Sequence, residues 1–255
     1  MKLQLLSDGK NNTKIGKNDI DTVRIFSLNL RPYTLPYKGK VMNVCPFASA
    51  ACAAACVGKN GHFSMSNGRA QKAQIRKTNL FHNSKHTFYK MLYHDMYEVQ
   101  EYCNDRGITP VFRLNAYSDI NHSSLSKIVL SDSLYNLFPE AIFYDYTKDV
   151  KKCLTSSFTN YSLTYSLSER SEADLLKHSI TFDDLREYVN IAVVFEKLPD
   201  FYKGIKVING DTTDNRFLDP ANCIVGLKFK GSKAKLLQGI ASGFVVPAFK
   251  ESIFA

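Results

Sequence analysis

Short runs of β-branched, aromatic and aliphatic residues recur along the chain, and in the first of them hydrophobic and polar positions alternate. Such runs, bounded by polar residues and turn formers, are typical of β-strands. The predicted strands cover residues 22–30, 111–116, 141–146, 161–166, 190–195, 205–210 and 223–229.

Helical patterns lie between several of these strands. The segment 84–106 places apolar residues on one helical stripe that Gly107 closes, and residues 66–83 form a basic helical pattern. Residues 123–138 and 171–188 are helical intervals further along. The stripe in 84–106 consists of Phe88, Met91, Leu92, Val99 and Cys103. Alternating strands and helices predict βαβ crossovers and a mostly parallel α/β sheet, either curled or open.

The domain organisation follows from length and from the distribution of polar segments. The 255 residues, of which 44% are hydrophobic, can supply a sizeable core. Residues 1–21 are polar and are expected to form a peripheral lead-in. No linker rich in Gly, Pro or Ser and no low-complexity segment interrupts the remainder. We therefore expect residues 22–255 to form a single α/β domain.

Composition limits the compartment and the partners. The chain has no apolar run of about 18 residues and no secretory leader pattern, so no membrane association and a cytoplasmic location are expected. Six cysteines are too sparse for a disulfide scaffold. The net charge of +9 would help the protein meet nucleic acid or an anionic substrate, although dispersed lysines equally suit an ordinary basic surface.

Three of the cysteines, Cys45, Cys52 and Cys56, fall within twelve residues in a C-x6-C-x3-C pattern. Thiolates so close together suit an iron–sulfur cluster or zinc. Three cysteines without an obvious fourth fit a [4Fe–4S] cluster with one iron left for another ligand. Zinc is one alternative, with His62, His82 or His86 as fourth ligand. The other alternative is an alanine-rich helix whose thiols are buried and bind no metal. The alanines around the cysteines leave room for a bulky cofactor.

Several segments together give a resemblance to a known family. They are CPFASAACAAAC with Arg69, RLNAYSDI at 113–120, FYDYTK at 143–148, and INGDTTDNRFLDP with IVGLKFKG near the end of the chain. In this ordered set the chain resembles the phage "gene product 88" family, whose members look like distant relatives of radical S-adenosylmethionine (SAM) enzymes. The resemblance implies a phage origin and a partial (β/α) barrel of mostly parallel strands, with a [4Fe–4S] cluster near their C-terminal ends.

The cysteine spacing departs from the radical SAM pattern. Typical radical SAM enzymes carry C-x3-C-x2-C with an aromatic residue before the last cysteine, whereas Ala55 precedes Cys56 here. The first hypothesis is an enzyme of this kind, with SAM as a possible co-substrate. Its pocket, at the ends of the strands, would be formed by Arg113, Asp119, Tyr146, Lys148 and Asp211. Arg113 and Lys148 would hold an anionic group, and Asp119 or Asp211 would transfer a proton or orient a donor.

Two further hypotheses compete with the enzyme. In one, a cluster or a zinc ion stabilises a protein that binds nucleic acid or a host protein through cations on helices 66–83 and 84–106. In the other, Asp211, Asp214 and Asp219 bind a hard cation such as Mg²⁺ in a hydrolase or nuclease. Turns, helix caps and an ion pair with Arg216 explain those carboxylates equally well.

Overall fold

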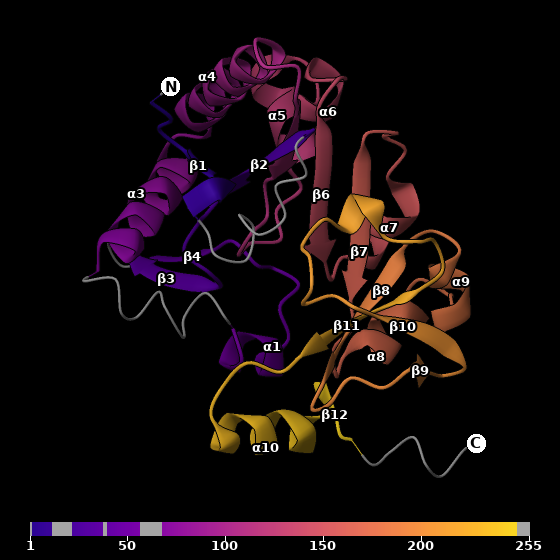
Figure 1. Cartoon of the computed structure of the whole chain (residues 1–255). Helices are drawn as coiled ribbons and strands as arrows, with labels where there is room; N and C mark the ends of the chain where they lie inside the picture. Colours follow the sequence, from indigo (N-terminus) through magenta and orange to yellow (C-terminus); the bar gives the residue numbers. More distant parts are fainter. Residues whose placement is uncertain (1, 12–21, 38–39, 57–67, 249–255) are drawn as a thin grey trace. The chain divides into compact units, whose positions relative to one another are not determined.

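A computed structural model of the chain describes residues 2–11, 22–37, 40–56 and 68–248 (Figure 1). The chain divides into two compact units. The first comprises Met1–Pro46, His62–Asp145 and Ser157–Ser162, and the second comprises Phe47–Gly61, Tyr146–Ser156 and Leu163–Ala255. Strands β6 (Ile142–Thr147) and β7 (Tyr161–Ser166) each begin in the first unit and end in the second. Whether the two units act as the single domain expected for residues 22–255 stays a prediction.

The strands of the first unit follow the order β1-β2-β5-β6. These are β1 (Leu6–Asp8), β2 (Val23–Leu28), β5 (Thr109–Arg113) and the start of β6. β1 is antiparallel to β2, whereas β2, β5 and β6 are mutually parallel. A separate antiparallel hairpin, β3 (Thr34–Tyr37) and β4 (Lys40–Asn43), follows β2.

Among the described residues of the first unit, four helices connect its parallel strands. They are α3 (Arg69–Asn83), α4 (Lys85–Asn104), α5 (His122–Leu130) and α6 (Leu134–Leu137). Ser84 separates α3 from α4, and its hydroxyl caps α4 by accepting the N–H of Thr87. On α4, Phe88, Leu92, Val99 and Cys103 are fully buried and Met91 is half-buried, which confirms the predicted apolar stripe.

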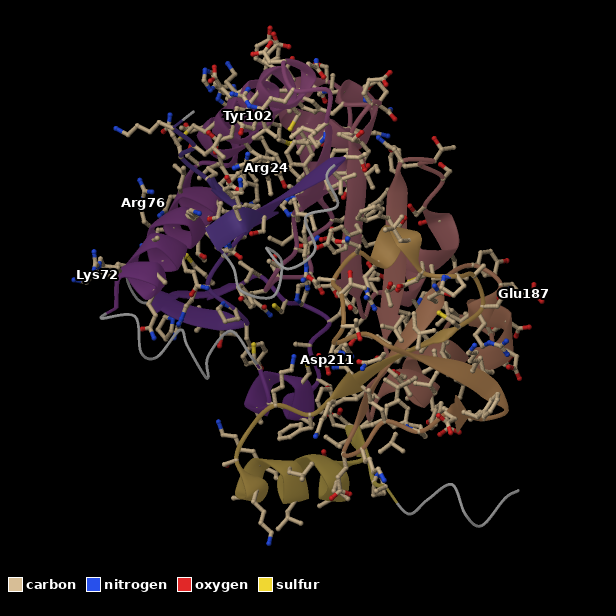
Figure 2. The ribbon with its side chains drawn as sticks, viewed as in Figure 1. Arg24, Lys72, Arg76, Tyr102, Glu187 and Asp211 are labelled. Atoms are coloured by element: carbon tan, nitrogen blue, oxygen red, sulfur yellow. The ribbon has the colours of Figure 1, made fainter. Side chains whose placement is uncertain are left out.

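The N-terminal lead-in contains an anchored strand that the sequence pattern did not indicate. The backbone N–H groups of residues 4–6 donate to the buried carboxylate of Asp95 on α4, over 2.6–3.0 Å. On β2, Arg24 pairs with Asp8 and donates to the Tyr102 hydroxyl (Figure 2). Three residues are too few to give a period, so this strand depends on contacts from α4. Residues 12–21 of the lead-in lie outside the described residues.

The second unit has the strand order β7-β8-β11-β10-β9, with the short β12 beside the end of β8. β7, β8 (Asn190–Phe195), β11 (Ile224–Lys228) and β10 (Ile205–Asn209) run parallel, while β9 (Phe201–Tyr202) is antiparallel to β10. The remaining elements are α1 (Ala50–Ala54), α7 (Val150–Thr155), α8 (Ser171–Leu176), α9 (Phe182–Arg186), the 3₁₀ turn Arg216–Leu218, α10 (Lys233–Ser242) and β12 (Val245–Val246).

The observed elements confirm the α/β class with mostly parallel strands. Each of the seven predicted strands has a counterpart, and 161–166 and 190–195 agree to the residue. The strand series of each unit is open among the described residues, so the partial barrel stays a prediction. In the part of the chain that the structure describes, no helix is long and apolar enough to cross a membrane.

Candidate functional site

Cys45, in the first unit, lies beside a loop at the C-terminal end of a parallel strand. Its thiol donates to the carbonyl oxygen of Tyr117, in the loop that follows β5, at an S···O distance of 3.3 Å. The backbone N–H of Tyr33 in turn donates to the Cys45 sulfur over 3.4 Å. Because both partners are backbone groups, the main-chain path determines where this half-buried sulfur lies.

The chain that holds Cys45 includes a strained residue. Tyr33 adopts a left-handed backbone conformation with φ 61°, which costs a residue with a side chain on the order of 1–2 kcal/mol. Its carbonyl accepts the N–H of Val44, and the Val44 carbonyl accepts the N–H of Asp119. These bonds connect the turn at Tyr33, the segment before Cys45 and the loop after β5.

The loop after β5 is organised by Asn115 and Asp145. The buried Asp145 carboxylate accepts the backbone N–H of Asn115 over 2.7 Å, its side-chain amide over 3.0 Å and the Tyr161 hydroxyl over 3.0 Å. The Asn115 side-chain oxygen accepts the Ser118 hydroxyl and the N–H of Ile120. Burial raises the pKa of Tyr161 well above its usual value, so its hydroxyl remains a donor to Asp145.

Arg113 and Asp119, the two predicted pocket residues of the first unit, lie at this same strand end. The Arg113 guanidinium is 5.7 Å from the ring centroid of the buried Tyr144, a distance suited to a cation–π contact. Asp119 is buried, with an exposed fraction of 8%. The structure therefore places both residues in or beside the loop that accepts the Cys45 thiol.

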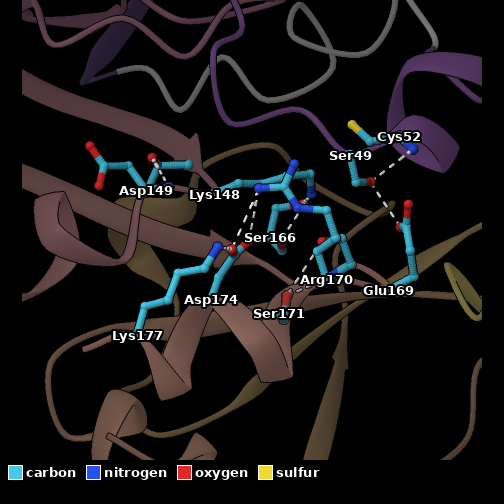
Figure 3. A network of polar contacts seen from close by, with 12 residues as sticks. Ser49, Cys52, Lys148, Asp149, Ser166, Glu169, Arg170, Ser171, Asp174 and Lys177 are labelled. Carbon is cyan, nitrogen blue, oxygen red and sulfur yellow. Dashed lines mark hydrogen bonds and ion pairs between the residues drawn. The ribbon is translucent and has the colours of Figure 1, made fainter. Parts of the chain in front are cut away.

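Cys52 lies on α1, in the second unit, and Cys56 follows that helix by two residues. The Ser49 hydroxyl accepts the N–H of Cys52 over 3.1 Å and donates to Glu169 over 2.8 Å (Figure 3). The other Glu169 oxygen accepts the N–H of Ala51 over 3.0 Å. Glu169 follows β7, so this half of the cysteine segment also lies at the C-terminal end of a parallel strand.

Alanines of α1, together with Ala55 directly after this helix, line a cavity of about 210 Å³ shared with α10. They are Ala50, Ala51, Ala54 and Ala55, and the rest of the lining consists of Glu169, Lys235, Gln238, Gly239 and Ser242. Small side chains let the two helices face each other across open space. None of the three cysteines is among the described residues that line this cavity, so room for a bulky cofactor beside the cysteines stays a prediction.

Lys148 and Tyr146, also predicted as pocket residues, are placed in the second unit. The Lys148 ammonium donates to the carbonyl and the hydroxyl of Ser166 over 2.8 and 2.7 Å, which ties the end of β6 to the end of β7. Its nitrogen lies 5.7 Å from the ring centroid of Phe244. Tyr146 is half-buried and packs beside a small apolar cluster that includes Cys223. Both residues thus have structural contacts at strand ends.

The acidic loop predicted as a hard-cation site contains ion pairs. Asp211 pairs with Lys230 over 2.7 Å and accepts the N–H of Lys228 over 2.8 Å. Asp219 lies 3.2 Å from the buried guanidinium of Arg216, and burial raises the pKa of this carboxyl. Among the described residues, no group of three or more His, Cys, Asp or Glu side chains could hold a metal ion as placed. The ion-pair interpretation of this loop therefore has the better support.

The residues that could supply a fourth ligand to a cluster or a zinc ion differ in burial. Cys223 is buried, and burial raises the pKa of its thiol to about 11, which disfavours the thiolate that a metal requires. His82 packs its ring against Phe81, and burial lowers its pKa. His86 is exposed on α4, and His62 lies outside the described residues.

Sequence reasoning missed the residues that position the candidate ligands. Asp145 was recognisable only as a polar residue near the end of a predicted strand, and Glu169 only as one after a strand, without a sign of what either contacts. Nothing in the sequence indicated the contribution of Tyr33, since it acts through its backbone N–H. Two features of the sequence could have indicated these positioning contacts. One is Ser49, a good helix N-cap three residues before Cys52, and the other is the presence of carboxylates at strand ends.

Comparisons with known proteins identify the family. The family model described as Gene product 88 matches residues 4–247, nearly the whole chain. Neither the search of curated proteins nor that of solved structures found a match. The match includes the cysteine segment, both strand-end loops that it contacts and the acidic loop, and it confirms the resemblance to the phage family. The chain belongs to the Gene product 88 family.

Proposed function

We propose that this protein binds a [4Fe–4S] cluster through Cys45, Cys52 and Cys56 and acts as a radical-SAM-like enzyme in the cytoplasm of the infected host. The proposal rests on one observation, made separately in each unit: a part of the cysteine segment contacts a residue that follows a parallel strand. Cys45 contacts the loop after β5, and the helix of Cys52 is capped by Glu169 after β7. The C-terminal ends of parallel strands are where α/β proteins form their functional sites.

The donor type supports the proposal, because cysteine thiolates are the usual ligands of iron–sulfur clusters. All three cysteines are half-buried. Cys45 already receives a backbone N–H, a type of contact that stabilises cluster-bound thiolates and adjusts the reduction potential. The thiol proton that Cys45 gives to Tyr117 would be lost on ligation, as metal binding by cysteine requires.

The cluster would supply one electron to a co-substrate such as SAM, and the chain would bind and orient the reactants. Arg113 and Lys148 are the cations proposed to hold an anionic group, and Asp119 or Asp211 would orient a donor or transfer a proton. Ser166, the present partner of Lys148, would compete with such an anion. Partial barrel closure, implied by the family resemblance, belongs to this same proposal.

Metal analysis tests the proposal. Protein purified without oxygen should contain about four iron and four acid-labile sulfide per chain, with a broad absorption near roughly 400 nm that dithionite bleaches. Addition of SAM should alter the spectrum if SAM binds the open iron. Cys45→Ser, Cys52→Ser and Cys56→Ser should each lower the iron content, whereas Cys153→Ala and Cys223→Ala, which change thiols outside the cysteine segment, should retain it. About one zinc per chain with no iron would overturn the cluster assignment.

A further inference from the structure

The positive charge of the chain is concentrated in one part of the sequence. Residues 22–94 contain eleven Lys or Arg and no Asp or Glu. The other residues hold 22 cations against all 24 anions, so they carry a slight net negative charge. The overall charge of +9 is therefore a property of this acid-free segment, which includes all of α3 and the first half of α4.

Helix α3 displays part of this charge in a regular array. Arg69, Lys72 and Arg76 are exposed, and their spacing of three and four residues places them on one face of the helix. We call these three residues the basic face. Figure 2 shows Lys72 and Arg76 directed outward from α3. The opposite side of α3 is buried through Gln74, Lys77, Thr78 and Phe81. Packing in the first unit therefore requires one face of the helix and leaves the basic face to solvent.

The spacing of the basic face suits a polyphosphate backbone. Along the helix axis its three cations are separated by about 4.5 and 6 Å, at a rise of about 1.5 Å per residue. A nucleic-acid strand presents one phosphate per roughly 3.4 Å of duplex axis, and flexible Arg and Lys side chains span the difference. Arg76 also donates weakly to the carbonyl of Gln4, over 3.5 Å, so this contact can be exchanged for a phosphate.

We infer that the basic face of α3 binds the phosphate backbone of nucleic acid without reading its sequence. Charge complementarity carries the inference, because the segment offers no carboxylate that would repel a phosphate or compete with it. Phosphate contacts position a protein on nucleic acid and carry no direct base information. The inference is independent of the cluster and does not require the proposed enzymatic activity.

Fluorescence anisotropy with labelled single-stranded and duplex DNA of random sequence tests this inference. The wild-type affinity should fall with salt, and three phosphate contacts should account for a roughly 20- to 40-fold loss between about 50 and 200 mM salt. The variant Arg69→Gln/Lys72→Gln/Arg76→Gln should bind more weakly at low salt, with a log–log salt slope smaller by about 2 to 3. A preference between the two probes would identify the form of nucleic acid.

A matched control separates the basic face from net charge. Lys151→Gln/Lys197→Gln/Lys233→Gln removes three exposed lysines from the second unit, and it should retain wild-type affinity and salt slope. Equal weakening of both triple variants, or no wild-type binding at low salt, would overturn the inference. Thermal unfolding and iron content measured on both variants distinguish a loss of nucleic-acid binding from a loss of folding or of the cluster.

Discussion

The two units hold their buried charges in different ways. In the first unit, Asp95 accepts three backbone N–H groups, and Asp145 accepts one backbone and two side-chain donors. In the second unit, Asp219 faces the guanidinium of Arg216. Carboxylates that accept backbone N–H groups, such as Asp95 and Asp145, define the path of the chain. A buried ion pair, in contrast, can be exchanged for apolar residues. The difference indicates that the first unit depends more strongly on single carboxylates.

The largest expected effect is at Asp95. Asp95→Ala leaves three N–H groups of residues 4–6 without their acceptor, and we expect the free energy of unfolding to fall by roughly 3–5 kcal/mol. Urea unfolding measures the change. Glu98→Gln, on the exposed face of the same helix, is the control and should change stability by less than about 0.5 kcal/mol. A small loss at Asp95 would remove the contrast between the two units.

The pair in the second unit should respond differently to single and double substitution. Asp219→Leu leaves the buried Arg216 without its carboxylate, and a loss of about 3 kcal/mol is expected. In Arg216→Met/Asp219→Leu both charges are absent, and stability should return to within about 1 kcal/mol of wild type. Chemical denaturation of wild type, Asp219→Leu, Arg216→Met and the double variant gives the coupling energy. A double variant no more stable than the single one would show that the pair is not exchangeable.

The buried Lys77 should make the stability of the first unit depend on pH. Burial lowers the pKa of Lys77 to about 8, with the nearby Arg76 adding to the shift and Asp95 opposing it. The unfolded chain therefore holds this proton more tightly, and stability should rise between about pH 8 and 10.5, by roughly 2–4 kcal/mol in total. Lys77→Met should lose this rise and be more stable than wild type at pH 7. Equal pH profiles of wild type and Lys77→Met would mean that the Lys77 ammonium reaches solvent. Lys72→Met, which changes an exposed lysine, is the control and should keep the wild-type profile.

The smallest effect is expected at Glu169. Glu169→Ala removes the acceptor for Ser49 and Ala51, which should cost about 1–2 kcal/mol of local stability. Amide hydrogen exchange of residues 49–56 should accelerate while β8 stays protected. Glu172→Gln, exposed on α8, should leave both unchanged. If exchange in α1 is unaffected, Glu169 does not hold the helix of Cys52, and the proposed cluster site loses its support in the second unit.

The sequence by itself determined the strands and helices with a clear hydrophobic period, the α/β class and the family. Local periodicity and turn residues suffice for strands such as 161–166 and for the apolar stripe of α4, because both arise from neighbours along the chain. The clustering of Cys45, Cys52 and Cys56 is likewise visible without coordinates. Very short elements such as β1 and β12 carry too few residues to show a period.

Only the tertiary structure decided which residues hold those elements and the cysteines in place. Glu169 lies more than a hundred positions from α1, and Asp145 lies thirty from Asn115, so no local pattern connects either residue with its partner. Tyr33 contributes a backbone N–H, which has no side-chain signature at all. Hydrogen bonds between distant segments depend on how the strands are ordered, and that order is decided by packing over the whole unit.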